Sequence, residues 1–263
     1  MNAIREPAVA GSFYPGGAGE LRAAVKRLLE GADQPPGPPP KALIAPHAGY
    51  IYSGPVAASA YARLLQHADR YTRIVLAGPS HRVPVAGLAT SARNAFRTPL
   101  GDVPVDREAI DRLNRLGVDT DDLAHRDEHC LEVHLPFLQM ALGGFSLVPL
   151  LVGDATAREV AAVLKALWGG DETLIVVSSD LSHYLPRETA RARDRATCAA
   201  IEQRDPGRIG HHDACGATPV RGLLLEAQRH GLEASTLDLR NSGDTAGGKE
   251  QVVGYGAWSF SGR

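Results

Sequence analysis

The chain has 263 residues, 44% of them hydrophobic and 22% charged, so it is long enough to bury a substantial core as one α/β domain. Its formal net charge of −2 excludes a general basic field, and we expect neither a nucleic-acid partner nor attraction to an anionic membrane. No segment approaches the roughly 20 apolar residues that span a bilayer. The 3 cysteines are too few for a disulfide framework. These features predict a cytoplasmic protein.

Helical and strand-like patterns alternate along the chain. A helix with Leu21, Val25, Leu28 and Leu29 near one face precedes a segment at 31–40 that is rich in glycine and proline, which we interpret as a surface loop. Runs rich in β-branched residues then predict five strands, at 41–45, 73–77, 145–152, 173–177 and 251–260.

Helical patterns separate the predicted strands. They lie at 54–68 and at 154–170, the second with Asp154 as its N-cap. This alternation predicts a single domain spanning residues 1–263, built as an α/β sandwich. We expect a mixed, mostly parallel central sheet with helices on both faces.

Three of the predicted strands are each followed within a few residues by a histidine: His47, His81 and His183. Residues just past parallel strands converge in the crevice at the carboxyl edge of the sheet, where α/β proteins bind ligands. Imidazole is the commonest protein ligand for zinc, copper and iron, and Asp180 could add an acid. A histidine after a strand can also be an ordinary loop residue, but the repeated placement favours a site.

A fourth candidate is Cys215, which lies just before a helix predicted from about Pro219 to His230. The exposed amides and dipole of a helix N-terminus favour a thiolate, which is a ligand or a nucleophile. The alternative is that Cys215 is a small buried side chain, as free cysteines most often are.

The remaining cysteines and an adjacent histidine pair are weaker candidates. Cys130 and Cys198 fall inside helical patterns, and for both we expect burial without chemistry. His211 and His212 point in different directions on any regular element, so we do not expect both to bind one ion.

A predicted helix over 126–142 carries Glu128 and Glu132 one turn apart. Its order of residues does not match the HExxH zinc signature, which argues against a metalloprotease. The two glutamates face either a cleft or solvent, and the sequence leaves both alternatives open. Three histidines lie close by: His125, His129 and His134.

Taken in order, seven segments resemble the successive signatures of the Memo family, whose bacterial members are called AmmeMemoRadiSam system protein B. The resemblance runs from about residue 5 to the C-terminus, and the segments HAGYIYSG and SSDLSHY are far more specific than any single metal motif. The seven segments are REPAVAGSFYPGG, APHAGYIYSGPVAASAY, GPSHRV, TPLGDVPVD, DEHCLEVHLPFLQ, VVSSDLSHY and CGATPVRGLL.

The resemblance implies a fold similar to the class III extradiol dioxygenases, which are non-haem iron enzymes that open catechol rings. It also implies an iron or copper ion held by His47, His81 and Cys215, with zinc as a further candidate. Asp180 and His183 match additional site residues, His183 as acid or base and Asp180 fixing its tautomer. Dioxygenases use a carboxylate where this chain has a cysteine, so ring cleavage does not follow from the resemblance.

Three functions are consistent with these residues. The first is a redox metalloenzyme acting on a small molecule, and the second is a non-catalytic module whose site binds a metal or a peptide. The third, implied by the bacterial family name, is a partner of AMMECR-type and radical SAM proteins in a modification pathway. The third can overlap with either of the others.

Overall fold

The computed structural model describes residues 3–33 and 36–262, and a twisted sheet of eight strands forms its centre. The strands of this sheet and of a second, smaller sheet are β1 (Ile4–Arg5), β2 (Ala42–Ala45), β3 (Arg73–Pro79), β4 (Leu88–Thr90), β5 (Ala95–Thr98), β6 (Gly101–Pro104), β7 (Asp119–Thr120), β8 (Ser146–Val152), β9 (Thr173–Ser178), β10 (Glu233–Asn241) and β11 (Gly254–Ser261). The large sheet has the order β10-β11-β2-β9-β3-β8-β4-β7, and a small sheet has the order β1-β5-β6.

The middle of the large sheet is parallel. Strands β2, β9, β3 and β8 run in one direction, whereas β11 joins β2, and β4 joins β8, in antiparallel pairs. The parallel strands are buried almost throughout, because each is a short run of apolar and mostly branched residues covered on both faces. The predicted mixed, mostly parallel sheet is confirmed.

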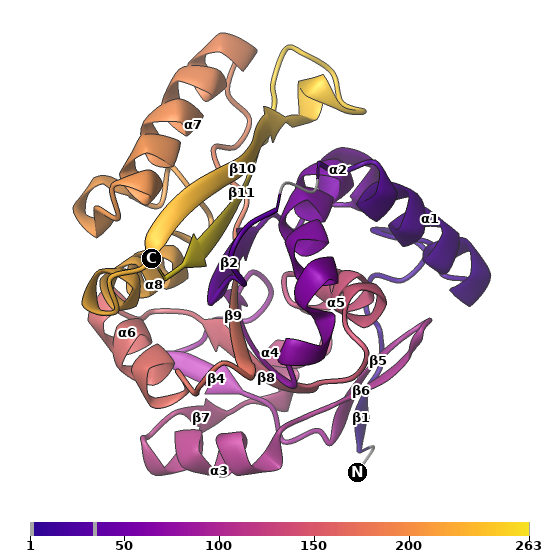
Figure 1. The fold of residues 1–263 in the computed structure, drawn as a ribbon, viewed down its shortest axis with the longest axis vertical. Helices are drawn as coiled ribbons and strands as arrows, with labels where there is room; N and C mark the ends of the chain where they lie inside the picture. The colour runs from indigo at the N-terminus through magenta and orange to yellow at the C-terminus, as the bar shows by residue number, and fades with distance from the viewer. Residues whose placement is uncertain (1–2, 34–35, 263) are drawn as a thin grey trace.

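Helices cover both faces of this sheet. The helices are α1 (Ala18–Glu30), α2 (Tyr50–Tyr61), α3 (Arg107–Arg115), α4 (Asp122–Arg126), α5 (Leu135–Ala141), α6 (Ala157–Ala166), α7 (Arg187–Glu202) and α8 (Ala217–Arg229), with short 3₁₀ segments η1 (Ala62–Arg70), η2 (Glu132–His134), η3 (Pro206–Arg208) and η4 (Ser242–Asp244). Figure 1 shows α6, α7 and α8 on one side of the strands, and α1, α2 and α5 on the other. The predicted α/β sandwich is therefore confirmed.

The predicted helix over 126–142 is wrong in its first half. Helix α4 ends at Arg126, residues 127–131 form a loop, and α5 begins only at Leu135. The Glu128 carboxylate accepts hydrogen bonds from the backbone of its own loop and from the backbone of His81, and these contacts compete with helix formation. A proline at position 136 then fits the first turn of the next helix.

Other predicted boundaries also shift. The N-cap of α6 is Thr156 and not Asp154, because Thr156 forms a capping box with Glu159. Strand β11 begins at Gly254, three residues later than predicted, and α2 begins at Tyr50, four residues earlier. Strand β10 was not predicted, because its polar residues carry no continuous apolar run.

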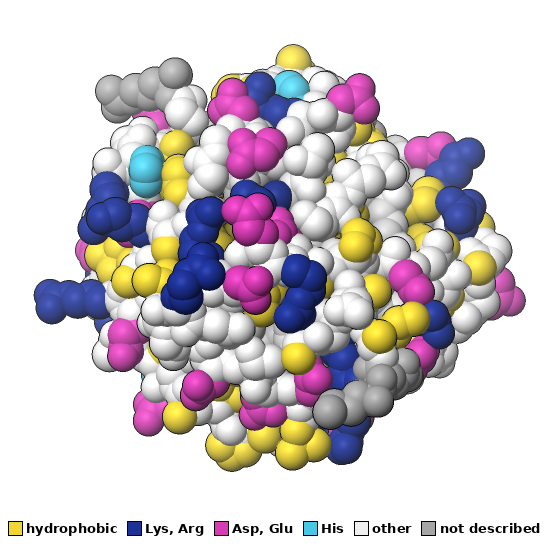
Figure 2. Space-filling view, turned by 90° about the horizontal axis from the view of Figure 1, so that it is seen from below, with side chains coloured by type: hydrophobic (Ala, Val, Ile, Leu, Met, Phe, Trp, Pro, Cys, Tyr) yellow, Lys and Arg dark blue, Asp and Glu magenta, His cyan; other side chains and the backbone are white. Residues whose placement is uncertain are grey.

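The glycine- and proline-rich segment behaves as a loop where it is described. Residues 31–33 and 36–40 contain no helix or strand, and residues 34 and 35 of the predicted loop lie outside the described residues. Across the described ranges, no helix combines the length and the apolar character needed to cross a membrane. Figure 2 shows basic and acidic side chains interspersed on the face it presents, as the net charge of −2 predicts.

Candidate metal centre

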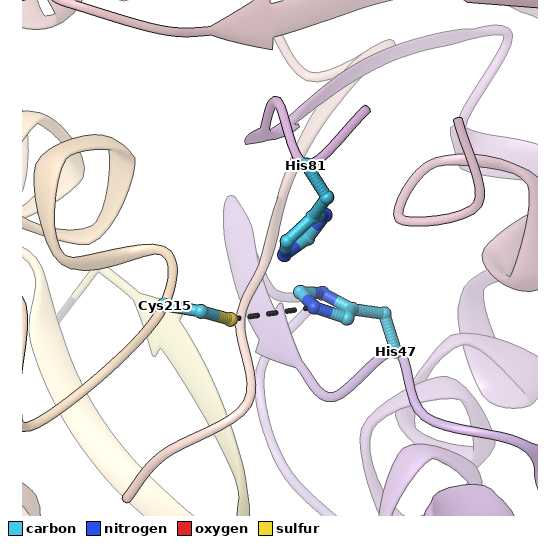
Figure 3. A group of neighbouring side chains, drawn as sticks. All are labelled: His47, His81 and Cys215. Atoms are coloured by element: carbon cyan, nitrogen blue, oxygen red, sulfur yellow. Dashed lines mark hydrogen bonds between the residues drawn. The ribbon is translucent and has the colours of Figure 1, made fainter. Parts of the chain in front are cut away.

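Two predicted histidines and one cysteine meet at the carboxyl edge of the parallel strands. His47 follows the end of β2 by two residues, and His81 follows the end of β3 by two residues. Cys215 reaches them from the loop before α8. One ligand atom from each of the three side chains lies within 4.8 Å of the other two, and Figure 3 shows both rings and the thiol directed at one another.

The spacing of these atoms suits a single metal ion. Bonds from zinc to sulfur or to imidazole nitrogen are about 2.0–2.3 Å long, so three atoms around one such ion lie at most about 4 Å from one another. The three ligand atoms lie within 4.8 Å of one another, and Cys215 Sγ is 3.3 Å from His47 Nε2, so modest side-chain movements would bring all three to bonding distance. Two imidazoles and a thiolate are ligands that copper, iron and zinc all accept.

His47 is the most enclosed of the three, with an exposed fraction of 2%. Its backbone N–H donates to Asp180 Oδ1 at 2.7 Å, and its ring nitrogens lie 2.6 Å from Ser178 Oγ and 3.3 Å from Cys215 Sγ. Burial, together with the nearby His81, His129 and His134 rings, holds the pKa of His47 well below its usual value. The ring is therefore neutral at neutral pH, as a metal ligand must be.

His81 is held by a buried glutamate. Its Nδ1 donates to Glu128 Oε1 at 3.0 Å, and its backbone N–H donates to Oε2 of the same carboxylate at 2.6 Å. Three more backbone N–H groups donate to this carboxylate, from Arg82, His129 and Cys130. His81, Glu128 and His129 form a second group whose ligand atoms lie within 4.8 Å of one another. Because Glu128 already accepts from all of these donors, we interpret it as a support that directs Nε2 of His81 away from itself.

The same contacts set the charge of Glu128. Burial by itself would raise the pKa of this carboxyl, but the neighbouring His129 and His81 rings and the backbone donors lower it far below its usual range. Glu128 is therefore a carboxylate at neutral pH. The sequence left open whether the two glutamates face a cleft or solvent, and the structure buries both. Glu128 supports the site, and Glu132 accepts a hydrogen bond from the backbone of the N-terminal segment at Ala8.

A third imidazole, His129, lies against the two predicted ones and was not singled out from the sequence. Its ring centroid is 4.7 Å from that of His81 and 5.5 Å from that of His47, and Phe13 covers it at 5.0 Å. His129 follows no strand, so a rule based on strand ends could not find it. Only the prediction of a loop over 127–131 would have placed it here.

Cys215 is positioned by close backbone contact with the loop after β9. Its N–H donates to the carbonyl of Asp180 at 3.2 Å, and the next residue, Gly216, packs so closely that a Cβ there would lie 2.6 Å from the carbonyl oxygen of Ser178. Of the two alternatives for Cys215, a thiolate and a small buried thiol, the pKa favours the thiol, because burial and the charge of Asp180 raise it to about 12. These effects outweigh the helix terminus. Such a thiol is a poor free nucleophile, but metal coordination would deprotonate it.

The structure has Asp180 beside His47, but His183 forms its hydrogen bond with a backbone carbonyl and not with Asp180. Asp180 is buried and accepts from the backbone of His47, and burial raises the pKa of its carboxyl. His183 is exposed and donates from Nδ1 to the carbonyl of Leu181 at 2.8 Å. The carbonyl of Leu181, and not Asp180, therefore fixes the tautomer of His183. His183 is not among the side chains whose ligand atoms converge.

The weaker candidates lie away from the three ligands or are enclosed by other contacts. Cys130 and Cys198 are buried, and the Cys130 thiol donates to the carbonyl of Pro79 at 3.0 Å. The sequence pattern predicted a helix at both cysteines. Cys198 does lie in a helix, α7, but Cys130 lies in the loop over 127–131. His211 and His212 are exposed and belong to no candidate metal group among the described residues.

The chain is similar to known protein sequences over nearly its whole length. The family described as Memo-like protein matches residues 5–259. The chain belongs to the Memo family. It is 39% identical to a MEMO1 family protein of Methanosarcina acetivorans, an alignment that covers 97% of this chain and 98% of the relative. MEMO1 family proteins of Methanothermobacter thermautotrophicus and Aquifex aeolicus are 36% and 35% identical, each over 96% of this chain and 98% and 97% of the relative.

The Memo match includes every residue of the candidate metal centre. His47, His81 and Cys215, together with Glu128, all lie between residues 5 and 259. The names of the Memo relatives give a family and no activity. A function for this Memo-family chain must therefore come from the chemistry of the site.

Proposed function

We propose that this Memo-family protein binds one iron or copper ion through His47, His81 and Cys215 and uses it for redox chemistry on a small molecule. The observation that carries the proposal is the convergence of two imidazoles and one thiol within 4.8 Å. Zinc is a further candidate, because it accepts the same ligands. A bound iron or copper ion would supply Lewis acidity and electron transfer.

The chain's own residues have separate tasks in this proposal. Glu128 holds His81 by its Nδ1, and Asp180 holds the backbone of His47, so both ligands are positioned before an ion arrives. Nε2 of His183, on the loop after β9, is free to hold or release a proton because Nδ1 is engaged with a carbonyl. Three ligands leave positions open for a small molecule.

A binding module is the second candidate, and exposed apolar side chains near the site favour it. Ile51 and Tyr52 follow His47 at the start of α2, with exposed fractions of 67% and 37%, and Tyr184 follows His183 with 70%. Apolar groups left in water beside a site are typical of surfaces that receive a ligand or a peptide. Association with AMMECR-type and radical SAM proteins stays a prediction from the family resemblance.

Metal content tests the proposed ligands. We expect anaerobically purified protein, reconstituted in turn with Fe²⁺, Cu⁺ and Zn²⁺, to retain one ion, and His81→Ala and Cys215→Ala to retain it at least about tenfold more weakly. The measurement is elemental analysis after gel filtration. His212→Ala is the matched control, because His212 is exposed and outside the site.

Equal or negligible metal content in all four proteins would contradict the metal site. For protein that holds its metal, oxygen uptake with a reductant and a panel of catechols separates the two candidates. Turnover favours the redox enzyme, and bound metal without turnover favours the binding module.

A further inference from the structure

A chain of buried polar groups extends from His47 into the core, on the side away from Cys215. Ser178 Oγ lies 2.6 Å from His47 Nδ1 and 2.8 Å from His134 Nε2, and the Tyr61 hydroxyl lies 2.7 Å from His134 Nδ1. All four side chains are at most 2% exposed. Ser178, His134 and Tyr61 are not among the proposed metal ligands.

The direction of these hydrogen bonds follows from the carbonyl of Cys130. Ser178 Oγ also lies 2.7 Å from this oxygen, which can only accept, so the single hydroxyl proton of Ser178 points there. Its two lone pairs are left for the two imidazoles. His47 must therefore donate from Nδ1, and His134 must donate from Nε2.

The Tyr61 end of this hydrogen-bonded series independently indicates the same tautomer for His134. His134 Nδ1 is the hydrogen-bond partner of the Tyr61 hydroxyl. Since a buried O–H group requires an acceptor, Tyr61 donates to His134 Nδ1, and this nitrogen carries no proton. The His134 proton is then on Nε2, as the carbonyl of Cys130 also requires. Burial lowers the pKa of His134 to about 3, so its ring stays neutral and keeps this single proton.

We propose that Ser178 is a positioning residue that fixes His47 in the tautomer with its proton on Nδ1, with His134 and Tyr61 holding the Ser178 hydroxyl in place. This tautomer leaves the lone pair of His47 Nε2 directed at Cys215 Sγ, where the ion is proposed to bind. The consequence for metal affinity rests on the proposed function. The tautomer itself is a property of the metal-free protein.

Nitrogen NMR of the metal-free protein tests the tautomer directly. In protein labelled with ¹⁵N-histidine, we expect His47 to show a protonated Nδ1 and an unprotonated Nε2, and His134 to show the reverse. His47→Gln and His134→Gln spectra assign the two rings. A protonated Nε2 on His47, or a mixture of both tautomers in the wild type, would overturn the proposal whether or not the protein binds metal.

Ser178→Ala then tests the role of the hydroxyl. We expect His47 to populate both tautomers in this variant, and its affinity for Co²⁺ to fall by about 10–100-fold, as is typical when the support of a ligand histidine is lost. Ser182→Ala is a matched control, because Ser182 is equally buried and its backbone N–H donates to Asp194, not to His47. An unchanged His47 tautomer in folded Ser178→Ala would contradict the assigned role.

Two combinations of results separate this inference from the metal proposal. A wild type with the expected tautomer and no affinity for Co²⁺, Fe²⁺, Cu⁺ or Zn²⁺ supports Ser178 as the positioning residue and contradicts the metal centre. A wild type that binds metal with a mixed His47 tautomer before loading supports the metal centre and contradicts the role of Ser178.

Discussion

Replacing Glu132 by alanine is expected to lower the free energy of unfolding by about 3–5 kcal/mol, the usual cost of leaving one partner of a buried ion pair alone. Glu132 is fully buried and accepts from Arg5, from the Tyr14 hydroxyl at 2.5 Å, and from the backbone N–H groups of Ala8 and Val9. Alanine removes the only negative charge that Arg5 contacts in the described part of the chain. Urea denaturation followed by circular dichroism measures the effect.

An exposed glutamate provides the comparison. Glu30 pairs with Lys26 one turn away on α1, and both side chains are more than 60% exposed. Since exposed pairs contribute about 0–1 kcal/mol, Glu30→Ala should leave stability nearly unchanged. A loss of less than about 1 kcal/mol in Glu132→Ala would show that the N-terminal segment does not depend on this buried pair.

Replacing Glu128 should weaken metal binding by about 10–100-fold without touching a ligand atom. Glu128→Gln keeps the length of the side chain and one acceptor oxygen, but its amide cannot serve the backbone donors and Nδ1 of His81 together. The His81 ring then loses the contact that orients it. Competition titration with Co²⁺ against a chelator of known affinity measures the change.

Glu128→Ala should combine this loss with a loss of stability. Four backbone N–H groups would be left without their acceptor, at about 1–3 kcal/mol for each one that water cannot reach. The control is Glu108→Gln, because Glu108 is 78% exposed and its ion-pair partner is Arg112. Metal affinity within about twofold of wild type in folded Glu128→Gln would mean that His81 does not need this support.

The parallel part of the fold was predictable because its signal is local. Strands β2, β3, β8 and β9 are short apolar runs, and the structure places each within two residues of its predicted bounds. Polar edge elements were harder. Strand β10 has exposed and half-buried residues throughout most of its length, so its place is fixed by pairing with β11 and not by its own composition.

In the candidate site, too, only the residues with a local sequence signal were predictable. His47 and His81 could be predicted because they follow strands, and their convergence needed only the parallel sheet. Glu128 and His129 could not, because the sequence pattern over 126–142 is helical and the loop is made by contacts of Glu128 with backbone and with a residue 47 positions away. The raised pKa of Cys215 depends on burial, which the position before α8 does not reveal.

The tautomers are a further property that only the structure provides. Ser178 ends β9 and Tyr61 ends α2, and His134 lies between them in η2, so three separate elements have to pack before the hydrogen bonds exist. In the sequence each of these residues is an ordinary core position. The hydrogen bonds that fix the tautomers join residues 44 and 73 positions apart in the sequence.

X-ray absorption of the metal-loaded protein tests the central claim most directly, because it counts the atoms around the ion. For the Zn²⁺-loaded protein we predict one sulfur at about 2.3 Å and two imidazole nitrogens at about 2.0–2.1 Å, with the sulfur lost in Cys215→Ser and retained in Cys130→Ser. A shell of nitrogen and oxygen alone in the wild type would contradict the metal centre at His47, His81 and Cys215.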